Sequence, residues 1–114
     1  MIFLASPYSS TVHNVEYDRY EAALGCTAAL IDKFQLPVFS PIVHCHGMAL
    51  EYAMPKDAKF WRKYNFAFLR KADALYVLKI DGWDDSVGVR MEINLALTLQ
   101  LPIHYVDEHG IEVL

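Results

Sequence analysis

Short apolar runs alternate with longer amphipathic stretches along this chain. The first run, residues 2–5, is apolar at every position and stops at Ser6 and Pro7. A run of that length is too short for a helix, and apolar residues on both faces are typical of a strand buried in a parallel sheet. By the same reasoning the predicted strands are residues 2–5, 37–39, 72–78 and 102–106, with a short tail strand expected at 111–113.

The stretches between these runs predict three amphipathic helices. In the longest, Val15, Ala22 and Leu30 recur among polar residues at helical spacing, and Gly25 is a weak point. The residues just before it, Ser9 to Thr11, can cap its first turn. The predicted helices are residues 12–34, 57–71 and 87–100, whereas residues 42–55, bounded by prolines, are expected to be irregular.

This order of elements predicts an α/β fold. Helices between consecutive strands imply right-handed crossovers and a parallel sheet that is covered on both faces. We therefore expect a small three-layer sandwich, flavodoxin-like or Rossmann-like, with a central parallel sheet of four to five strands and all 114 residues in one domain. Ligands bind such sheets at the carboxyl ends of the strands, near a switch in strand order.

The composition indicates that part of the surface is apolar. An apolar fraction of 54% is high for a chain of this size. A small domain has too little interior to hide so many large side chains, so some of them are expected to lie between subunits. The sequence therefore predicts a homo-oligomer, a dimer or a tetramer.

Charge and cysteine content indicate which kinds of partner and which cellular compartment to expect. The net charge of −4 is spread along the chain, and the only basic cluster, between Lys56 and Lys71, is interleaved with other residues. A polymeric nucleic acid is therefore a poor partner, while a small anion fits. Cys26 and Cys45 form no CxxC pair, no leader is evident, and no apolar run approaches the roughly 20 residues of a membrane span. We expect a cytoplasmic protein without membrane contact.

Polar residues gather directly after three of the predicted strands, where a ligand of a parallel sheet would lie. Glu92 follows the loop that contains Ser86 and Gly88. It falls in the first turns of a predicted helix, where free N–H groups stabilise anions. Spacing alone favours a structural interpretation, because acidic residues are common in first helical turns. The candidate residues after the strands are Ser6, Tyr8 and Ser9, then Ser40, His44 and His46, then the run from Asp81 to Ser86, which includes Gly82 and Trp83, and finally Gly88.

Two motifs resemble the nucleoside 2-deoxyribosyltransferase superfamily. They are the run from Asp81 to Ala96 and the opening Ile2 to Tyr8, and the order of elements agrees over nearly the whole chain. Ser86 lies six residues before Glu92, which resembles the branch of deoxynucleoside 5'-monophosphate N-glycosidases, where that serine helps to hold the 5'-phosphate. The chain is also similar to an uncharacterised bacterial and phage group with the same Gly-Trp-x-x-Ser-x-Gly signature.

The resemblance implies an enzyme that cleaves or transfers the N-glycosidic bond of a nucleoside 5'-monophosphate or nucleoside. Glu92 would attack the anomeric carbon and form a glycosyl-enzyme, and Tyr8 would hydrogen-bond this glutamate. The family carries an aspartate where this chain has Asn65, and an amide cannot transfer a proton at neutral pH. Such chemistry needs no cofactor.

The other candidates keep two interpretations each. Trp83 can stack on a nucleobase or anchor an interface, and Asp81 can contact the base or solvate a loop. His44 and His46 can line the pocket or belong to the core, and the spacing predicts no metal site. Two alternative functions stay open, a catalytically silent nucleotide-binding module of the same fold and a structural or regulatory oligomer.

Overall fold

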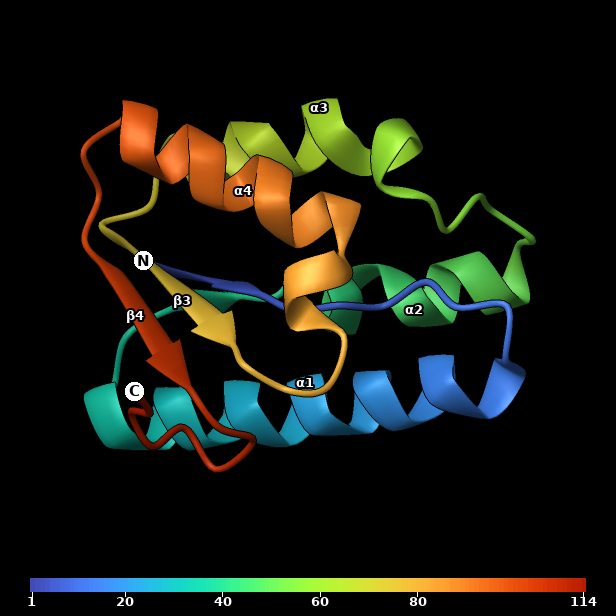
Figure 1. Ribbon diagram of the computed structural model, residues 1–114, viewed down its shortest axis with the longest axis horizontal. Coiled ribbons are helices and arrows are strands. Elements are labelled where there is room, and N and C mark those ends of the chain that lie inside the picture. Colours follow the sequence, from blue (N-terminus) through green and yellow to red (C-terminus); the bar gives the residue numbers. More distant parts are fainter.

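The protein is an α/β structure built on a parallel sheet. We describe it from a computed structural model of residues 1–114, which defines the whole backbone and every side chain except that of His13. The sheet has four strands, all parallel, in the order β2-β1-β3-β4 (Figure 1). The strands are β1 (Ile2–Ala5), β2 (Val38–Phe39), β3 (Ala74–Leu78) and β4 (Ile103–Val106).

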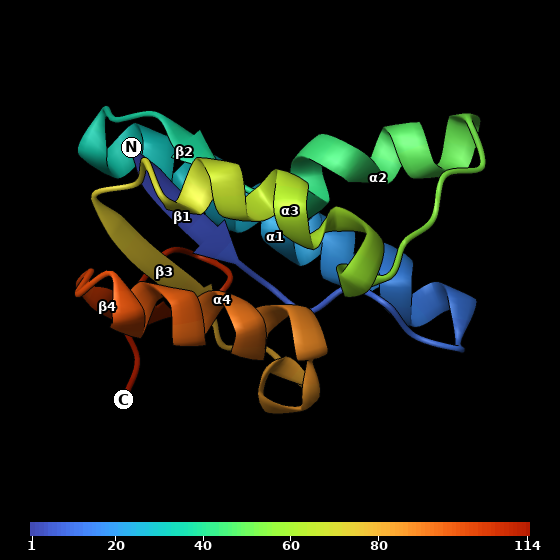
Figure 2. The ribbon, with the colours of Figure 1, turned by 90° about the horizontal axis from the view of Figure 1, so that it is seen from above.

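Four α-helices and one 3-10 turn accompany the sheet. Helix α1 covers one face, α3 and α4 lie side by side on the other, and α2 extends beyond the ends of the strands (Figures 1 and 2). The helices are α1 (His13–Phe34), α2 (Pro41–Glu51), α3 (Ala58–Leu69) and α4 (Val87–Thr98), and the 3-10 turn η1 is Trp83–Asp85. The expected three-layer arrangement is therefore confirmed, with four strands.

Each face of the sheet has its own apolar core, and the alternation of side chains along β1 explains why. Ile2 and Leu4 pack toward α1, whereas Phe3 and Ala5 pack toward α3 and α4. Successive side chains of a strand point to opposite faces, so a strand covered on both sides is apolar throughout. This is why the short run 2–5 could be recognised as a buried strand.

The segment after β2 differs from its prediction. Residues 42–55 were expected to be irregular, but most of them form α2. Ser40 caps this helix by accepting a hydrogen bond from the Val43 N–H, and Pro41 occupies the first turn, where its missing N–H costs nothing. Ser40 and Pro41, which by sequence end a strand and precede an irregular segment, therefore begin a helix.

Two smaller differences concern the expected tail strand and the start of α1. The expected tail strand at 111–113 is only an isolated antiparallel bridge between Val106 and Glu112. Helix α1 begins after Val12, which makes no side-chain cap, so the serines before it do not cap the helix as expected. The helix continues through Gly25 without a break.

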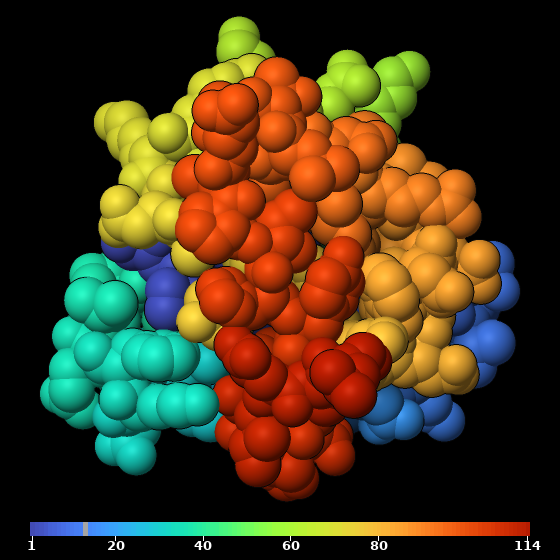
Figure 3. All heavy atoms as spheres, turned by 60° about the vertical axis from the view of Figure 1, so that its left-hand side comes forward, coloured from blue at the N-terminus to red at the C-terminus, as the bar shows by residue number. Residues whose placement is uncertain are grey.

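The C-terminal residues complete one side of the molecule. In Figure 3 the orange and red part of the chain forms a continuous band over the side where β4 is the edge strand. None of the helices in the described part of the chain combines the length and the apolar character that crossing a bilayer requires.

The strand order places a switch point between β1 and β3. From β1 the chain crosses to β2 on one side, and from β2 it returns to β3 on the other side of β1. Loops that leave β1 and β3 in opposite directions open a crevice at the carboxyl ends of these strands. The residues just after β1 and β3 therefore face a common space.

Candidate functional site

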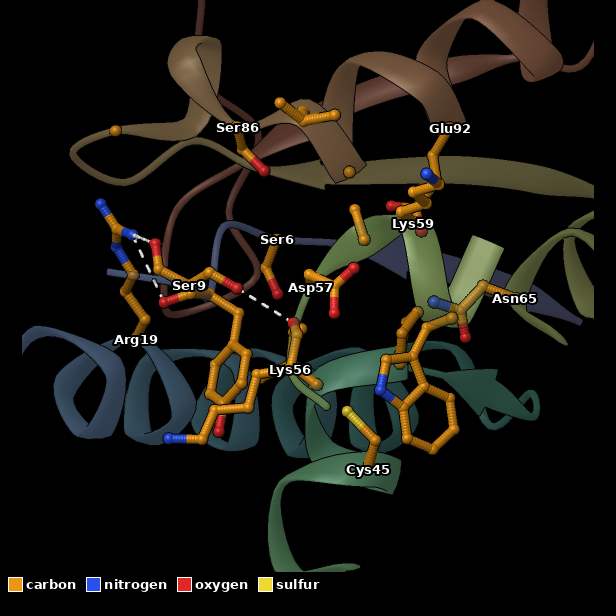
Figure 4. Close-up of a pocket in the computed structure, with 18 of the residues that line it drawn as sticks. Ser6, Ser9, Arg19, Cys45, Lys56, Asp57, Lys59, Asn65, Ser86 and Glu92 are labelled. Atoms are coloured by element: carbon orange, nitrogen blue, oxygen red, sulfur yellow. Dashed lines mark hydrogen bonds between the residues drawn. The ribbon is translucent and has the colours of Figure 1, made fainter. Parts of the chain in front are cut away.

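A cavity of about 510 Å³ lies at this switch point. Its volume is within the usual range for small-molecule sites. The lining combines the loops after β1 and β3 with residues of α1 and of the N-terminal parts of α2, α3 and α4 (Figure 4). The lining residues are Ser6, Tyr8, Ser9, Arg19, Pro41, Ile42, Cys45, Lys56, Asp57, Ala58, Lys59, Trp61, Asn65, Gly82, Asp85, Ser86, Val87, Gly88 and Glu92.

The N-termini of α2, α3 and α4 all border the cavity. Each helix is capped by a side-chain oxygen, from Ser40, Asp57 and Ser86 respectively. The first turn of a helix carries unpaired N–H groups and the positive end of the helix dipole. Three such ends around one cavity favour a ligand with negative charge.

Glu92 projects from α4 into this cavity (Figure 4). Val89, Glu92 and Ala96 are the buried positions of α4, so the carboxyl occupies the core-facing stripe of the helix. Burial raises the pKa of Glu92 to about 8. No hydrogen bond or ion pair of its carboxyl group is found among the described residues.

The protonation of Glu92 therefore differs from the expectation that the helix N-terminus keeps it ionised. Glu92 lies beyond the first turn of α4, which contains no acidic residue. The free N–H groups and the dipole act mainly within that first turn. Desolvation consequently dominates, and it favours the protonated form of this carboxyl group.

Three cationic side chains also line the cavity, those of Arg19, Lys56 and Lys59. The Arg19 Nη1 donates to the backbone carbonyl of Ser9 at 2.9 Å, which fixes the guanidinium beside the loop after β1. The Lys56 Nζ pairs with Glu16 at 3.1 Å. Lys59 makes no hydrogen bond or ion pair with another described residue.

Gly82 allows Arg19 to reach this position. Its φ of +88° is unfavourable for side chains with a Cβ. A Cβ there would lie 2.3 Å from the Arg19 Nη2, so the guanidinium packs against bare backbone. The loop after β3 is thus in direct contact with a residue of α1.

Two serines, Ser6 and Ser86, present hydroxyl groups to this cavity. Ser6, directly after β1, is buried, and its hydroxyl has no hydrogen-bond partner among the described atoms. Because buried hydroxyl groups are almost always paired, an unpaired one in a cavity indicates a place for a ligand or water. Ser86 accepts from the Val89 N–H at 3.2 Å and can still donate its own proton.

The sequence matches one family over residues 1–108. The chain belongs to DUF1937, a domain of unknown function. No curated protein matches it. Every residue that lines the cavity lies within the DUF1937 match.

Tyr8 has a different partner in this DUF1937 chain from the one that the resemblance implied. Its hydroxyl is hydrogen-bonded to the His46 Nδ1 at 2.6 Å, not to Glu92. His46 is buried and stacks on Tyr20, with ring centroids 4.0 Å apart. Burial, with Glu16 nearby, raises the pKa of Tyr8 to about 12.

Burial also lowers the pKa of His46, and Lys56 adds to this effect. The Nδ1 of a neutral imidazole can accept a hydrogen bond from the Tyr8 hydroxyl, which gives both buried groups a partner. The pair joins the loop after β1 to α2, which fixes one wall of the cavity.

Twelve residues are predicted to act in catalysis or to bind the substrate, and the structure brings eight of them into the cavity. His46 lies behind Tyr8, and His44 bonds the Tyr64 hydroxyl at 2.7 Å in a neighbouring apolar groove. Asp81 and Trp83 line a separate surface hollow, where the Trp83 ring packs on Tyr105. The eight that line the cavity are Ser6, Tyr8, Ser9, Asn65, Gly82, Ser86, Gly88 and Glu92.

Sequence reasoning missed most of the charged part of the lining. Lys56 and Lys59 belong to the basic cluster that predicted a small anion rather than a nucleic acid polymer, but nothing placed them at the site. Arg19 stands in the middle of a long helix, where nothing local distinguishes it from a solvated residue. Asp57 was recognised only as the start of a helix. Their common role follows from tertiary packing.

His44 and His46 do not point to the same side of the chain. Because the segment is helical rather than extended, His44 and His46 turn to different partners, Tyr64 and Tyr8. Within the described part of the chain, no group of three or more His, Cys, Asp and Glu side chains could hold a metal ion.

Proposed function

We propose that this DUF1937 chain cleaves the N-glycosidic bond of a nucleoside 5'-monophosphate, with Glu92 as the nucleophile. The observation that carries the proposal is a buried, unpartnered carboxyl group in a cavity at the switch point of the sheet. In a variant of the same reaction, the sugar is transferred to another base instead of to water. The resemblance to nucleoside 2-deoxyribosyltransferases gives this carboxyl group its role.

A phosphate group suits one end of the cavity. Ser86 and Gly88 begin α4, and Arg19 adds a guanidinium beside the same loop. Oxyanions bind where free N–H groups and a cation converge. A Cβ at Gly88 would lie 3.4 Å from the Ala58 Cβ, so the start of α4 packs closely against the start of α3.

The proposed reaction begins with ionisation of Glu92. Its carboxylate then attacks C1 of the sugar, the C1–N bond breaks, and the electron pair leaves with the base. The positive charge that develops on the sugar ring stabilises the Glu92 carboxylate, which is buried away from water. A group that is neutral in the free protein thus becomes charged along the reaction.

The test is base release. Purified protein is incubated with a panel of ribonucleoside and deoxyribonucleoside 5'-monophosphates, and the free base is measured by chromatography. We expect release from at least one monophosphate and a loss of at least about 100-fold in Glu92→Gln, which is the scale of removing a reacting group. Glu51→Gln, an exposed acid outside the cavity, is the matched control.

The same assay predicts a pH dependence. Since the pKa of Glu92 is about 8 and the ionised form reacts, kcat/KM is expected to rise as the pH increases from 6 to 9. A rate that is constant or falls over this interval would contradict the assignment of Glu92 as a nucleophile with a raised pKa.

One observation favours a second function, a nucleotide-binding module without turnover. Asn65 lines the cavity but cannot transfer a proton, and Glu92 is neutral in the free protein. This alternative predicts stabilisation by nucleotides without base release. A ligand at a hundred times its dissociation constant raises the free energy of unfolding by about 2.7 kcal/mol, which a thermal shift detects.

A further inference from the structure

A second carboxylate, that of Asp57, lies in the same cavity as Glu92. Asp57 lines the wall at the start of α3, whereas Glu92 comes from α4. In Figure 4 the Asp57 side chain lies in the central space of the cavity, between Ser6 and Asn65. Besides that of Asp85, the cavity therefore holds one carboxyl group at the start of α3 and another on α4. Glycoside hydrolysis uses a pair of carboxyl groups.

Only one oxygen of Asp57 has a structural task. Its Oδ2 accepts a hydrogen bond from the Phe60 N–H at 3.2 Å, which caps α3. Its Oδ1 has no partner among the hydrogen bonds and ion pairs of the described residues. Because a carboxylate offers about four lone-pair sites, the capping bond leaves Oδ1 able to accept a proton from water.

The other groups of the cavity are poorly suited to that task. Asn65 is an amide. Asp57 and Asp85 are both exposed, but Asp85 also pairs with the Arg90 guanidinium at 3.8 Å. The Tyr8 hydroxyl is bound to His46. Burial raises the pKa of the Cys45 thiol to about 11, so it is neutral at ordinary pH.

We propose that Asp57 is a further catalytic residue, the general base of the hydrolytic step, and this inference rests on the proposed function. A water molecule attacks C1 of the sugar that is esterified to Glu92, and its proton passes to Asp57 Oδ1. The bond between C1 and the Glu92 oxygen breaks, and its electron pair remains on the Glu92 carboxylate. Asp57 then releases the proton to solvent, which restores both carboxylates.

The experiment compares wild type with Asp57→Asn. The amide oxygen of asparagine can still cap α3, but it cannot take the proton. We expect steady-state base release to fall by about 100-fold or more, on the usual scale of general base catalysis. A first turnover of base should remain, because formation of the glycosyl-enzyme does not need Asp57.

Sodium azide separates a catalytic role from a structural one. Azide is already an anion, so it attacks C1 without a base. It is expected to restore base release in Asp57→Asn, with a glycosyl azide as the product, and to have little effect on wild type. A damaged cavity would not respond to azide. Asp57→Ser, which also caps a helix, repeats the test if the asparagine variant folds poorly.

Asp32→Asn is the control, because Asp32 is an exposed acid on α1 outside the cavity. Wild-type rates in Asp57→Asn, or a loss that azide does not restore in a folded variant, would overturn the inference while leaving the proposed function intact. A wild-type protein that releases no base from any monophosphate overturns the proposed function and, with it, the role of Asp57.

Discussion

Glu92 couples the stability of the protein to pH. Its pKa rises from 4.5 in the unfolded chain to about 8 in the folded one. Between these values the folded state binds a proton that the unfolded state releases, so stability falls as the pH increases through this interval. Above the folded pKa the loss is complete, and below the unfolded pKa it is absent.

Glu92→Gln should remove this pH dependence. The difference in free energy of unfolding between variant and wild type is expected to grow in favour of the variant from pH 5 to pH 8, by a few kcal/mol at most. Urea denaturation at several pH values measures it. Glu51→Gln, on the exposed surface, should show no such trend. A constant difference across the interval would contradict the raised pKa.

The Tyr8–His46 pair offers a second prediction at the residue scale. Tyr8→Phe leaves the buried Nδ1 of His46 without its partner at 2.6 Å, and His46→Phe leaves the phenol unpaired. Each is expected to lower the free energy of unfolding by about 1–3 kcal/mol. The double variant should lose less than the sum, because neither polar group is left behind.

Denaturant titration of wild type, the two single variants and the double variant measures these differences in the free energy of unfolding. Tyr52→Phe is the control, since Tyr52 is exposed and has no side-chain hydrogen bond among those described. Strict additivity of the two single variants would show that the bond contributes little to folding.

At the scale of elements, the caps of α2 and α4 permit a matched comparison. Ser40 and Ser86 each accept a hydrogen bond of 3.2 Å from the third residue of their helix. Ser40→Ala and Ser86→Ala are each expected to lower the free energy of unfolding by about 1 kcal/mol. Only Ser86 lines the cavity.

The two caps should therefore differ in ligand binding. Ser86→Ala is expected to weaken binding of a nucleoside 5'-monophosphate more than binding of the corresponding nucleoside, as measured by calorimetry. Ser40→Ala should leave both affinities near those of wild type. Equal effects of Ser86→Ala on both ligands would argue against a phosphate at the start of α4.

At the scale of the whole molecule, the surface keeps large apolar side chains. Tyr17, Leu24 and Ile31 are spaced seven residues apart along α1 and are all exposed. Solvent contact of such a stripe is unfavourable, and association buries it. The homo-oligomer stays a prediction, and light scattering after gel filtration is expected to give a multiple of the 13.0 kDa chain mass. A mass of one chain at all concentrations would contradict it.

The strands and three of the helices could be predicted from the sequence because their signal is local. An apolar run such as residues 2–5, or a stripe such as that of α4, follows from which side chains one element buries. Helix α2 was missed although its start, Ser40-Pro41, is equally local, because the same pair also occurs in turns.

The sequence by itself determined the parallel α/β fold, the end of the sheet where a ligand would lie, and Glu92 as the residue to examine there. Only the tertiary structure decided that burial raises the pKa of Glu92, that Tyr8 bonds His46, and that Arg19, Lys56 and Asp57 share the cavity of Glu92. The reason is physical. Periodicity records what each element buries, whereas desolvation and pairing depend on side chains that packing brings together from distant parts of the chain.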